Sequence, residues 1–293
     1  MKALVTLLRQ AALALMVATV CVAQPAEPSR VVIVPVLNLY SAPSLDADVV
    51  SQAIYATAVK VLEDQGSWAR IHTPDDDYVG WVESASLLTP PRPYASGTDV
   101  VHVSSLYAHV YREASVTKHA PLLTVPFEAR LEVERAAPQT EGWLAVRLLD
   151  GRTGYVQRGD VASTGPPLTA EQTIALSKKF LGLPYTWGGT SSYGYDCSGF
   201  MQMLMRQRGY SMPRDAGPQA NWTGSVPVEK ADVQPGDLLY FGSSIEKVTH
   251  TGLYLGAGQF INATTYSTPM VRIDNLDEPR WTKLLVAIRR VKP

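Results

Sequence analysis

Hydrophobic and polar positions divide the chain into two parts with different periodicity. Before residue 163 the apolar residues come in short runs that nearly alternate with polar ones, and polar turns separate these runs. A period of two is typical of half-buried β-strands. After residue 168 two helical patterns come first and strand patterns follow. The pattern therefore predicts an all-β N-terminal part and an α+β C-terminal part.

The all-β part contains an internal repeat. In both halves a tryptophan precedes a Gly-aromatic-Val strand by about the same distance; the paired residues are Trp68 with Gly80, and Trp143 with Gly154. Units of about 60 residues with short strands favour small barrels. We expect one barrel over residues 30–90 and another over 98–163, each followed by a proline-containing linker.

The third unit is expected over residues 168–293. Thr169 and Gln172 fit a capping box, which predicts the start of a helix. After a glycine-rich turn, a second helix is predicted to begin at Asp196 or Cys197. The strands predicted beyond it cover residues 237–241, 251–255, 259–263 and 284–291.

The first 23 residues indicate export. They combine an early basic residue, a short apolar run and a small residue at Ala23, as in a secretory signal peptide. The run is too short for a good membrane span, so no integral span is expected. Cys21 leaves with the signal if cleavage follows Ala23, and the alternative is a lipid anchor on Cys21. The expected location is periplasmic or extracellular.

Composition narrows the function classes. The chain is 46% hydrophobic and carries a formal net charge of −1. This balance predicts folded domains and argues against a nucleic-acid partner, which needs a clustered basic surface. The acidic run at 75–77 lacks the further oxygen ligands of a calcium loop, and no metal or cofactor is expected. We expect a monomer.

Cys197 is the first candidate for chemistry. It stands at a predicted helix start, where unpaired backbone N–H groups and the helix dipole favour a thiolate and so lower the pKa of a thiol. The alternative is a small buried structural cysteine. The position and the exported setting favour a nucleophile.

His250 is the candidate base, because the other histidines all fall in the β repeats. A hairpin through residues 256–258 that pairs 252 with 262 puts Asn262 on the same face of the ladder as His250. Cysteine, histidine and a polar orienting residue form the arrangement of papain-like thiol catalysis. The alternatives for Asn262 are a strand-end turn residue and a glycosylation acceptor.

Several short motifs then occur in order along the third unit: Pro184-Tyr185-Thr186-Trp187-Gly188-Gly189, Asp196-Cys197-Ser198-Gly199-Phe200, Pro213-Arg214-Asp215, Pro235-Gly236-Asp237-Leu238 and His250-Thr251-Gly252-Leu253-Tyr254. With these motifs, residues 168–293 resemble the NlpC/P60 family of bacterial cell-wall cysteine peptidases. The two upstream units resemble bacterial SH3-like domains. The resemblance implies an α+β papain-like catalytic domain preceded by two small all-β SH3-like barrels.

By resemblance, Cys197 would be the nucleophile, His250 the general base and Asn262 the third polar residue, where the family often has histidine. Tyr185 would stabilise the oxyanion or contact substrate, and its alternative is packing beside Trp187. The residues expected to bind substrate are Asp196, Ser198, Arg214, Asp215 and, from the first barrel, Glu83. By resemblance, Asp196 would hold the free α-amine of L-alanine, and Glu83 would assist it. A helix cap is the alternative for Asp215, and a structural ion pair for Arg214.

The resemblance also implies the reaction. The upstream pair of barrels is similar to that of family members that cleave γ-D-glutamyl bonds to meso-diaminopimelate or lysine in free murein peptides with an N-terminal L-alanine. Peptidoglycan stem peptides are therefore the expected partners. Hydrolysis of intact wall is a variant of the same class. A catalytically inactive wall-binding module and a thiol amidase or acyltransferase on another acyl substrate are the alternatives.

Overall fold

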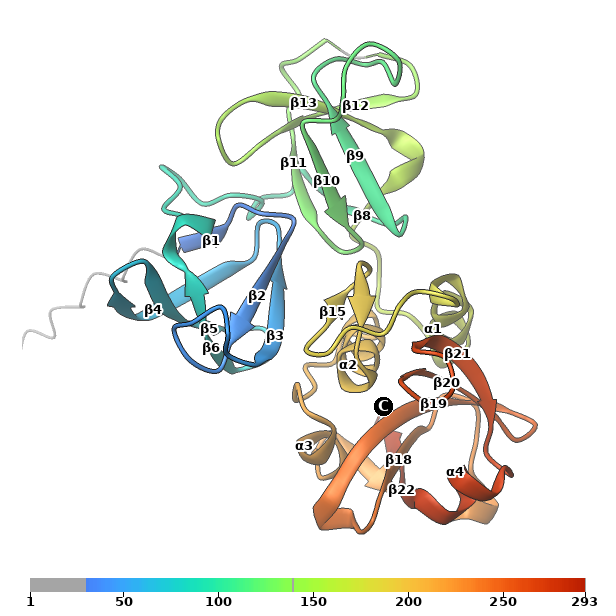
Figure 1. The fold of residues 1–293 in the computed structure, drawn as a ribbon. Helices are drawn as coiled ribbons and strands as arrows, with labels where there is room; N and C mark the ends of the chain where they lie inside the picture. The colour runs from blue at the N-terminus through green and yellow to red at the C-terminus, as the bar shows by residue number, and fades with distance from the viewer. Residues whose placement is uncertain (1–29, 139, 293) are drawn as a thin grey trace, which may run out of the picture.

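The computed structural model describes residues 30–138 and 140–292. The predicted signal peptide, with Cys21, lies outside the described residues. Figure 1 shows three bodies: two β-barrels and a larger domain that contains both helices and a sheet. Within the described residues no helix is long and apolar enough to cross a membrane.

The first barrel is an antiparallel sheet whose strands follow the order β3-β2-β6-β5-β4-β1-β7. Its strands are β1 (Arg30–Val32), β2 (Val36–Tyr40), β3 (Val49–Ile54), β4 (Ala58–Gln65), β5 (Trp68–Thr73), β6 (Tyr78–Glu83) and β7 (Leu87–Leu88). Alternate residues of these strands point inward, as the sequence pattern predicts. Val32, Leu39 and Ile71 form part of the fully buried core.

The second barrel repeats this topology strand for strand, in the order β10-β9-β13-β12-β11-β8-β14. Its strands are β8 (Val100–Val103), β9 (Tyr107–Tyr111), β10 (Leu123–Pro126), β11 (Arg130–Val133), β12 (Trp143–Arg147), β13 (Thr153–Gln157) and β14 (Val161–Ser163). The repeated glycine has a steric cause. A Cβ at Gly80 would lie 2.8 Å from the Leu39 side chain, and one at Gly154 would lie 2.4 Å from Val110.

The C-terminal domain is built on a six-stranded sheet, β17-β22-β18-β19-β20-β21. Its elements are α1 (Ala170–Ser177), β15 (Thr190–Ser191), β16 (Gly194–Tyr195), α2 (Cys197–Gln207), α3 (Ala216–Ala220), β17 (Ser225–Pro227), β18 (Leu238–Gly242), β19 (Val248–Gly256), β20 (Gln259–Thr264), β21 (Met270–Asn275), α4 (Pro279–Leu284) and β22 (Leu285–Val291). The capping box of Thr169 and Gln172 is confirmed in both of its hydrogen bonds.

Helix α2 is almost entirely buried and packs on one face of this sheet. Phe200 and Leu204 of the helix lie in one cluster with Leu253 and Ile261 of the sheet. The opposite face carries a second cluster around Phe241 and Trp281. Helix α2 is therefore held rigidly, and its N-terminus is fixed against β19.

The β15–β16 hairpin contacts both barrels immediately before α2 (Figure 1). The backbone N–H of Thr190 donates to the Gln52 side chain of β3 at 3.1 Å. Ser192 bonds to Leu106 and Phe127 of the second barrel. Glu128 of the second barrel also pairs with Arg206 of α2. Both barrels thus contact and stabilise the segment that precedes Cys197.

Candidate active site

Cys197 is the first residue of α2, as the sequence predicts. Asp196 is the N-cap, and its carboxylate accepts a hydrogen bond from the Gly199 backbone at 2.7 Å. The approach to the neighbouring turn is tight, because a Cβ at Gly199 would lie 2.2 Å from the Gly189 carbonyl oxygen. The two glycines of the sequence motifs therefore let the helix start pack directly on the glycine-rich turn.

Burial dominates the electrostatics of the thiol. Cys197 is 8% exposed, and this desolvation, aided by the Asp196 charge, raises the pKa of the thiol to about 12. Backbone N–H groups of Thr251 and Ser198 and the nearby Arg214 charge act in the opposite direction but are weaker. The expectation of a lowered pKa is therefore wrong, because desolvation outweighs the effect of the helix start.

His250 lies on β19, next to the residue whose backbone reaches the Cys197 sulfur. The predicted hairpin register is confirmed, with Leu253 opposite Ile261 and Tyr254 opposite Phe260. The His250 Nε2 lies 2.8 Å from the Asn262 Oδ1. This bond makes Nε2 the protonated nitrogen and leaves Nδ1 for proton exchange with the thiol.

The imidazole is half-buried and lies against aromatic rings. Trp281 stacks on it with ring centroids 5.2 Å apart and 25° between the planes. Desolvation lowers the pKa of His250 to about 4, against the raising effects of Asn262 and Asp274. Both shifts favour the neutral thiol and the neutral imidazole near pH 7.

Arg272 and Asp274 contact Asn262 and were not predicted from the sequence. The Asn262 Nδ2 donates to the Asp274 Oδ2 at 3.0 Å and lies 3.3 Å from the Arg272 carbonyl oxygen. Arg272 in turn pairs with the other Asp274 oxygen at 2.6 Å. The side chain of Asp274 has no exposed surface. Recognition of β21 would have found the pair, because Arg272 lies opposite Asn262 in the ladder.

On the other side of Cys197, Arg214 forms a buried ion pair with Asp196. Its guanidinium also donates to Ser198 at 2.9 Å and to Ser51 of the first barrel at 3.1 Å. Arg214 is 2% exposed, which matches the structural ion pair considered from the sequence. The Asp196 carboxylate is thereby occupied by Arg214 and by the helix N-terminus.

Asp215 is different, because its carboxylate has no ion pair among the described residues. It occupies the N-cap position of α3, yet its side chain makes no capping hydrogen bond. Its Oδ2 lies 3.5 Å from the Tyr78 hydroxyl of the first barrel. Burial, opposed by the Arg214 charge, raises the pKa of Asp215. The carboxylate is thus available to a ligand at the junction of the two domains.

Tyr185 lies half-buried in the chain just before the hairpin, against the main hydrophobic cluster. Burial and the charges of Cys197 and Asp196 raise the pKa of its hydroxyl, which therefore stays protonated as a donor. Trp187, in contrast, is 70% exposed. The structure does not bring Glu83 to this group. Glu83 is the last residue of β6 and Tyr78 is the first. At a rise of about 3.4 Å per residue, the strand keeps Glu83 away from Tyr78 and from Asp215.

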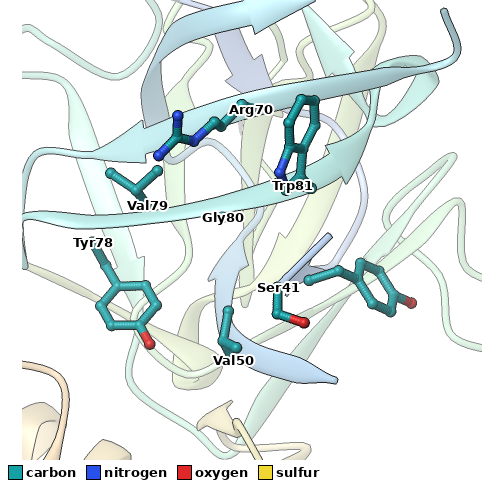
Figure 2. A pocket seen from close by; sticks show the side chains of 8 residues that line it. Ser41, Val50, Arg70, Tyr78, Val79, Gly80 and Trp81 are labelled. Atoms are coloured by element: carbon teal, nitrogen blue, oxygen red, sulfur yellow. The ribbon is translucent and has the colours of Figure 1, made fainter. Parts of the chain in front are cut away.

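The first barrel has a hollow of about 350 Å³ that is lined in part by Tyr78. Figure 2 shows its lining, in which Gly80 and Val79 of β6 lie between Arg70 and Trp81 on one side and Tyr78 and Val50 on the other. Because Tyr78 also faces Asp215, the surface beside the carboxylate continues onto the barrel. Among the described residues no group of three or more His, Cys, Asp or Glu side chains could hold a metal ion.

Comparisons with known proteins agree with this geometry. The profile of the NlpC/P60 family matches residues 182–290, and that of the bacterial dipeptidyl-peptidase Sh3 domain matches residues 39–87. The chain is 32% identical to a gamma-D-glutamyl-L-lysine dipeptidyl-peptidase of Bacillus subtilis, over 82% of this chain and 80% of that protein. A protein of the same name from Bacillus cereus is 30% identical over 83% and 75%.

A solved structure extends the likeness to the fold. The crystal structure of an NlpC/P60 family protein from Bacillus cereus superposes with a TM-score of 0.78 and 26% identity, covering 90% of this chain and all of that one. Its length includes the region of both barrels. With Cys197 and His250 in place, the chain belongs to the NlpC/P60 family and is a cysteine-type peptidase with an N-terminal SH3-like domain.

Proposed function

We propose that this peptidase hydrolyses the γ-D-glutamyl bond to a diamino acid, meso-diaminopimelate or lysine, in peptidoglycan stem peptides with a free N-terminal L-alanine. The printed names of the Bacillus relatives, both gamma-D-glutamyl-L-lysine dipeptidyl-peptidases, support the bond. The unpaired Asp215 carboxylate beside Tyr78 carries the rest of the proposal. A carboxylate without a cationic partner favours a cationic ligand, and Tyr78 of the first barrel lies beside it.

The chemistry starts from the neutral pair. As the Cys197 sulfur attacks the γ-carbonyl carbon, its proton passes to Nδ1 of His250. The oxyanion accepts hydrogen bonds from the backbone N–H of Cys197 at the helix start and from the protonated Tyr185 hydroxyl. His250 then gives the proton to the leaving amine and a thioester remains. Water, deprotonated by His250, hydrolyses the thioester and restores the thiol.

Proton transfer during attack suits this site better than a resting ion pair. A thiolate with an imidazolium would be costly in the buried unliganded site, where the pKa of the thiol is about 12 and that of the imidazole about 4. Asn262 fixes the ring in the tautomer that the step needs. Substrate therefore meets a site that is already oriented.

The amine subsite is assigned to Asp215 and not to Asp196. Arg214 already neutralises Asp196, whereas Asp215 has the Tyr78 hydroxyl as its neighbour. Asp196 and Ser198 then contribute by holding Arg214 and the helix start in position. We also propose that the second barrel is a second SH3-like domain, because its strand order repeats that of the first, and that the protein is exported.

The test is a mass-spectrometric digest of L-Ala-γ-D-Glu-diaminopimelate and of the same peptide with its α-amine acetylated. Wild-type enzyme should release L-Ala-γ-D-Glu from the free peptide, and Cys197→Ala should release none. Asp215→Asn should lower kcat/KM on the free peptide about tenfold or more and narrow the difference from the acetylated one. Equal cleavage of both peptides by wild type would refute the amine subsite, and no cleavage of either would refute the substrate class.

A further inference from the structure

The residues around His250 determine what the leaving half of a substrate meets. The general acid must lie within hydrogen-bond distance of the leaving amine, so side chains beside the imidazole contact the amino acid that departs. Trp281 of α4 stacks on the imidazole. Tyr266 meets the Trp281 ring edge-on, with centroids 5.8 Å apart.

Arg280 is held on these two aromatic rings. Its guanidinium carbon lies 4.3 Å from the Tyr266 ring centroid and 5.5 Å from that of Trp281. Cation–π contacts of this kind hold a guanidinium in place without using its N–H donors. The Arg280 side chain is exposed.

The donors of Arg280 have no carboxylate to bind. Among the described residues no acidic side chain pairs with Arg280 within 4.0 Å, although Glu278 and Asp277 are close in sequence. The two other arginines near the site are both occupied, Arg214 by Asp196 and Arg272 by Asp274. Arg280 is thus a cation beside His250 that has no ion pair among the described residues.

The chain from Tyr266 to Met270 runs back beside the segment that holds Tyr185. Tyr185, which interacts electrostatically with Cys197, donates its backbone N–H to the Pro269 carbonyl oxygen at 3.2 Å. Pro184 and Met270 form a bridge beside it. Asp215 therefore lies on the side of Asp196 and Cys197, and Arg280 lies on the side of His250. Neither side chain has an ion pair among the described residues.

We propose that Arg280, positioned by Tyr266 and Trp281, binds a carboxylate of the amino acid on the leaving side of the scissile bond. The inference rests on the proposed function and adds the specificity of the leaving half. A short stem peptide carries an amine at one end and a carboxylate at the other. These charges are complementary to those of Asp215 and Arg280. The carboxylate has two sources: the α-carboxylate of a C-terminal diamino acid, or the second carboxylate of diaminopimelate.

The experiment compares acids with amides. The substrates are L-Ala-γ-D-Glu-L-Lys and L-Ala-γ-D-Glu-meso-diaminopimelate, each with its C-terminal α-carboxylate free or amidated. Wild type should prefer the free acid, and Arg280→Gln should lower kcat/KM for the acids about tenfold to a hundredfold while the acid-to-amide ratio falls toward one. Lys283→Gln, an exposed cation on the same helix, is the matched control and should keep the wild-type ratio.

The outcomes distinguish the two carboxylate sources, and they show which of the two proposals fails. Weaker cleavage of the α-amide than of the acid in both peptides, with this difference lost in Arg280→Gln, assigns the α-carboxylate. Equal cleavage of the acid and the α-amide of the diaminopimelate peptide, both better than the lysine peptides and with that advantage lost in Arg280→Gln, assigns the second carboxylate. An equal fall for all four peptides in Arg280→Gln, or no change in any of them, overturns the proposal. Wild type that cleaves every peptide without preference overturns the proposal alone, whereas wild type that cleaves none overturns the proposed function with it.

Discussion

The Asn262 side chain connects His250 to a buried carboxylate: its Oδ1 lies 2.8 Å from the imidazole, and its Nδ2 donates to Asp274 at 3.0 Å. An asparagine carries no charge, so by itself it can only orient the ring. The Asp274 charge behind it raises the pKa of His250 and partly opposes the desolvation. Asp274 is thus a positioning residue that also supplies the negative charge Asn262 lacks.

Asp274→Asn should therefore affect both rate and pH dependence. The amide has one oxygen instead of two and no charge, so it weakens the bonds to Asn262 and Arg272, and we expect kcat to fall about tenfold with KM nearly unchanged. Loss of the negative charge lowers the pKa of His250 further, so the acid limb of the kcat/KM profile should move to lower pH. Steady-state kinetics between pH 2.5 and 9 would measure both effects.

Asp277→Asn is the control, because this carboxylate is exposed on the turn after β21. It should leave both quantities at the wild-type values. A fall in kcat with an unmoved acid limb would mean that Asp274 acts only through packing.

The reactivity of Cys197 tests whether the thiol is neutral in the free enzyme. Since burial raises the pKa of Cys197 to about 12, alkylation by iodoacetamide should be slow at pH 7 and accelerate throughout the range up to pH 10. Peptide mass spectrometry of the Cys197 peptide against time gives the rate at each pH, with Cys197→Ser as the blank. A rate plateau between pH 5 and 8 would instead indicate a resting thiolate–imidazolium pair.

His250 should make the protein less stable in acid. The pKa of His250 is lowered from 6.5 to about 4 in the folded state, so between these values the unfolded chain binds a proton that the folded one does not. The free energy of unfolding therefore decreases as the pH falls below about 6.5, by at most about 3 kcal/mol in total. Above pH 6.5 this group makes no pH-dependent contribution.

The measurement is urea unfolding of wild type and His250→Gln at pH 7, 6 and 5. Other titrating groups are common to both proteins, so the stability of His250→Gln relative to wild type should increase toward acid pH. Parallel stability curves would show that folding does not lower the pKa of His250.

The catalytic hairpin was predictable because its information is local. The glycine turn at 256–258 and the alternation along β19 fix the register that brings Asn262 to His250. The capping box and the helix start at Cys197 are local in the same way. These features depend on residues a few positions apart, where sequence patterns are informative.

The contacts between distant segments could not be predicted from such patterns. Ser51 and Tyr78 reach Arg214 and Asp215 across more than a hundred residues of chain. Glu83 was chosen from the same strand as Tyr78, but only the docking of the barrel decides which end of β6 faces the peptidase domain. The pKa of Cys197 likewise depends on the enclosure of the thiol by β19, which the helix start alone does not reveal.

The second barrel should stabilise the peptidase domain through Glu128. Glu128 has a left-handed backbone (φ 71°) that turns its carboxylate toward α2, where it pairs with Arg206 at 2.6 Å and accepts from Gln207 at 2.7 Å. The neighbouring Phe127 packs on Phe180 with ring centroids 5.2 Å apart.

Glu128→Gln leaves the Arg206 charge without its counterion. Because 37% of the Arg206 side chain is exposed, we expect a loss of about 1–2 kcal/mol in the free energy of unfolding, less than for a fully buried pair. Urea unfolding at pH 7 measures it. Glu113→Gln, which removes the exposed pair with Lys118, should cost less than about 0.5 kcal/mol. Equal losses in the two variants would mean that the Glu128 pair contributes no more than a surface ion pair, and that packing around Phe127 holds the barrel to α2.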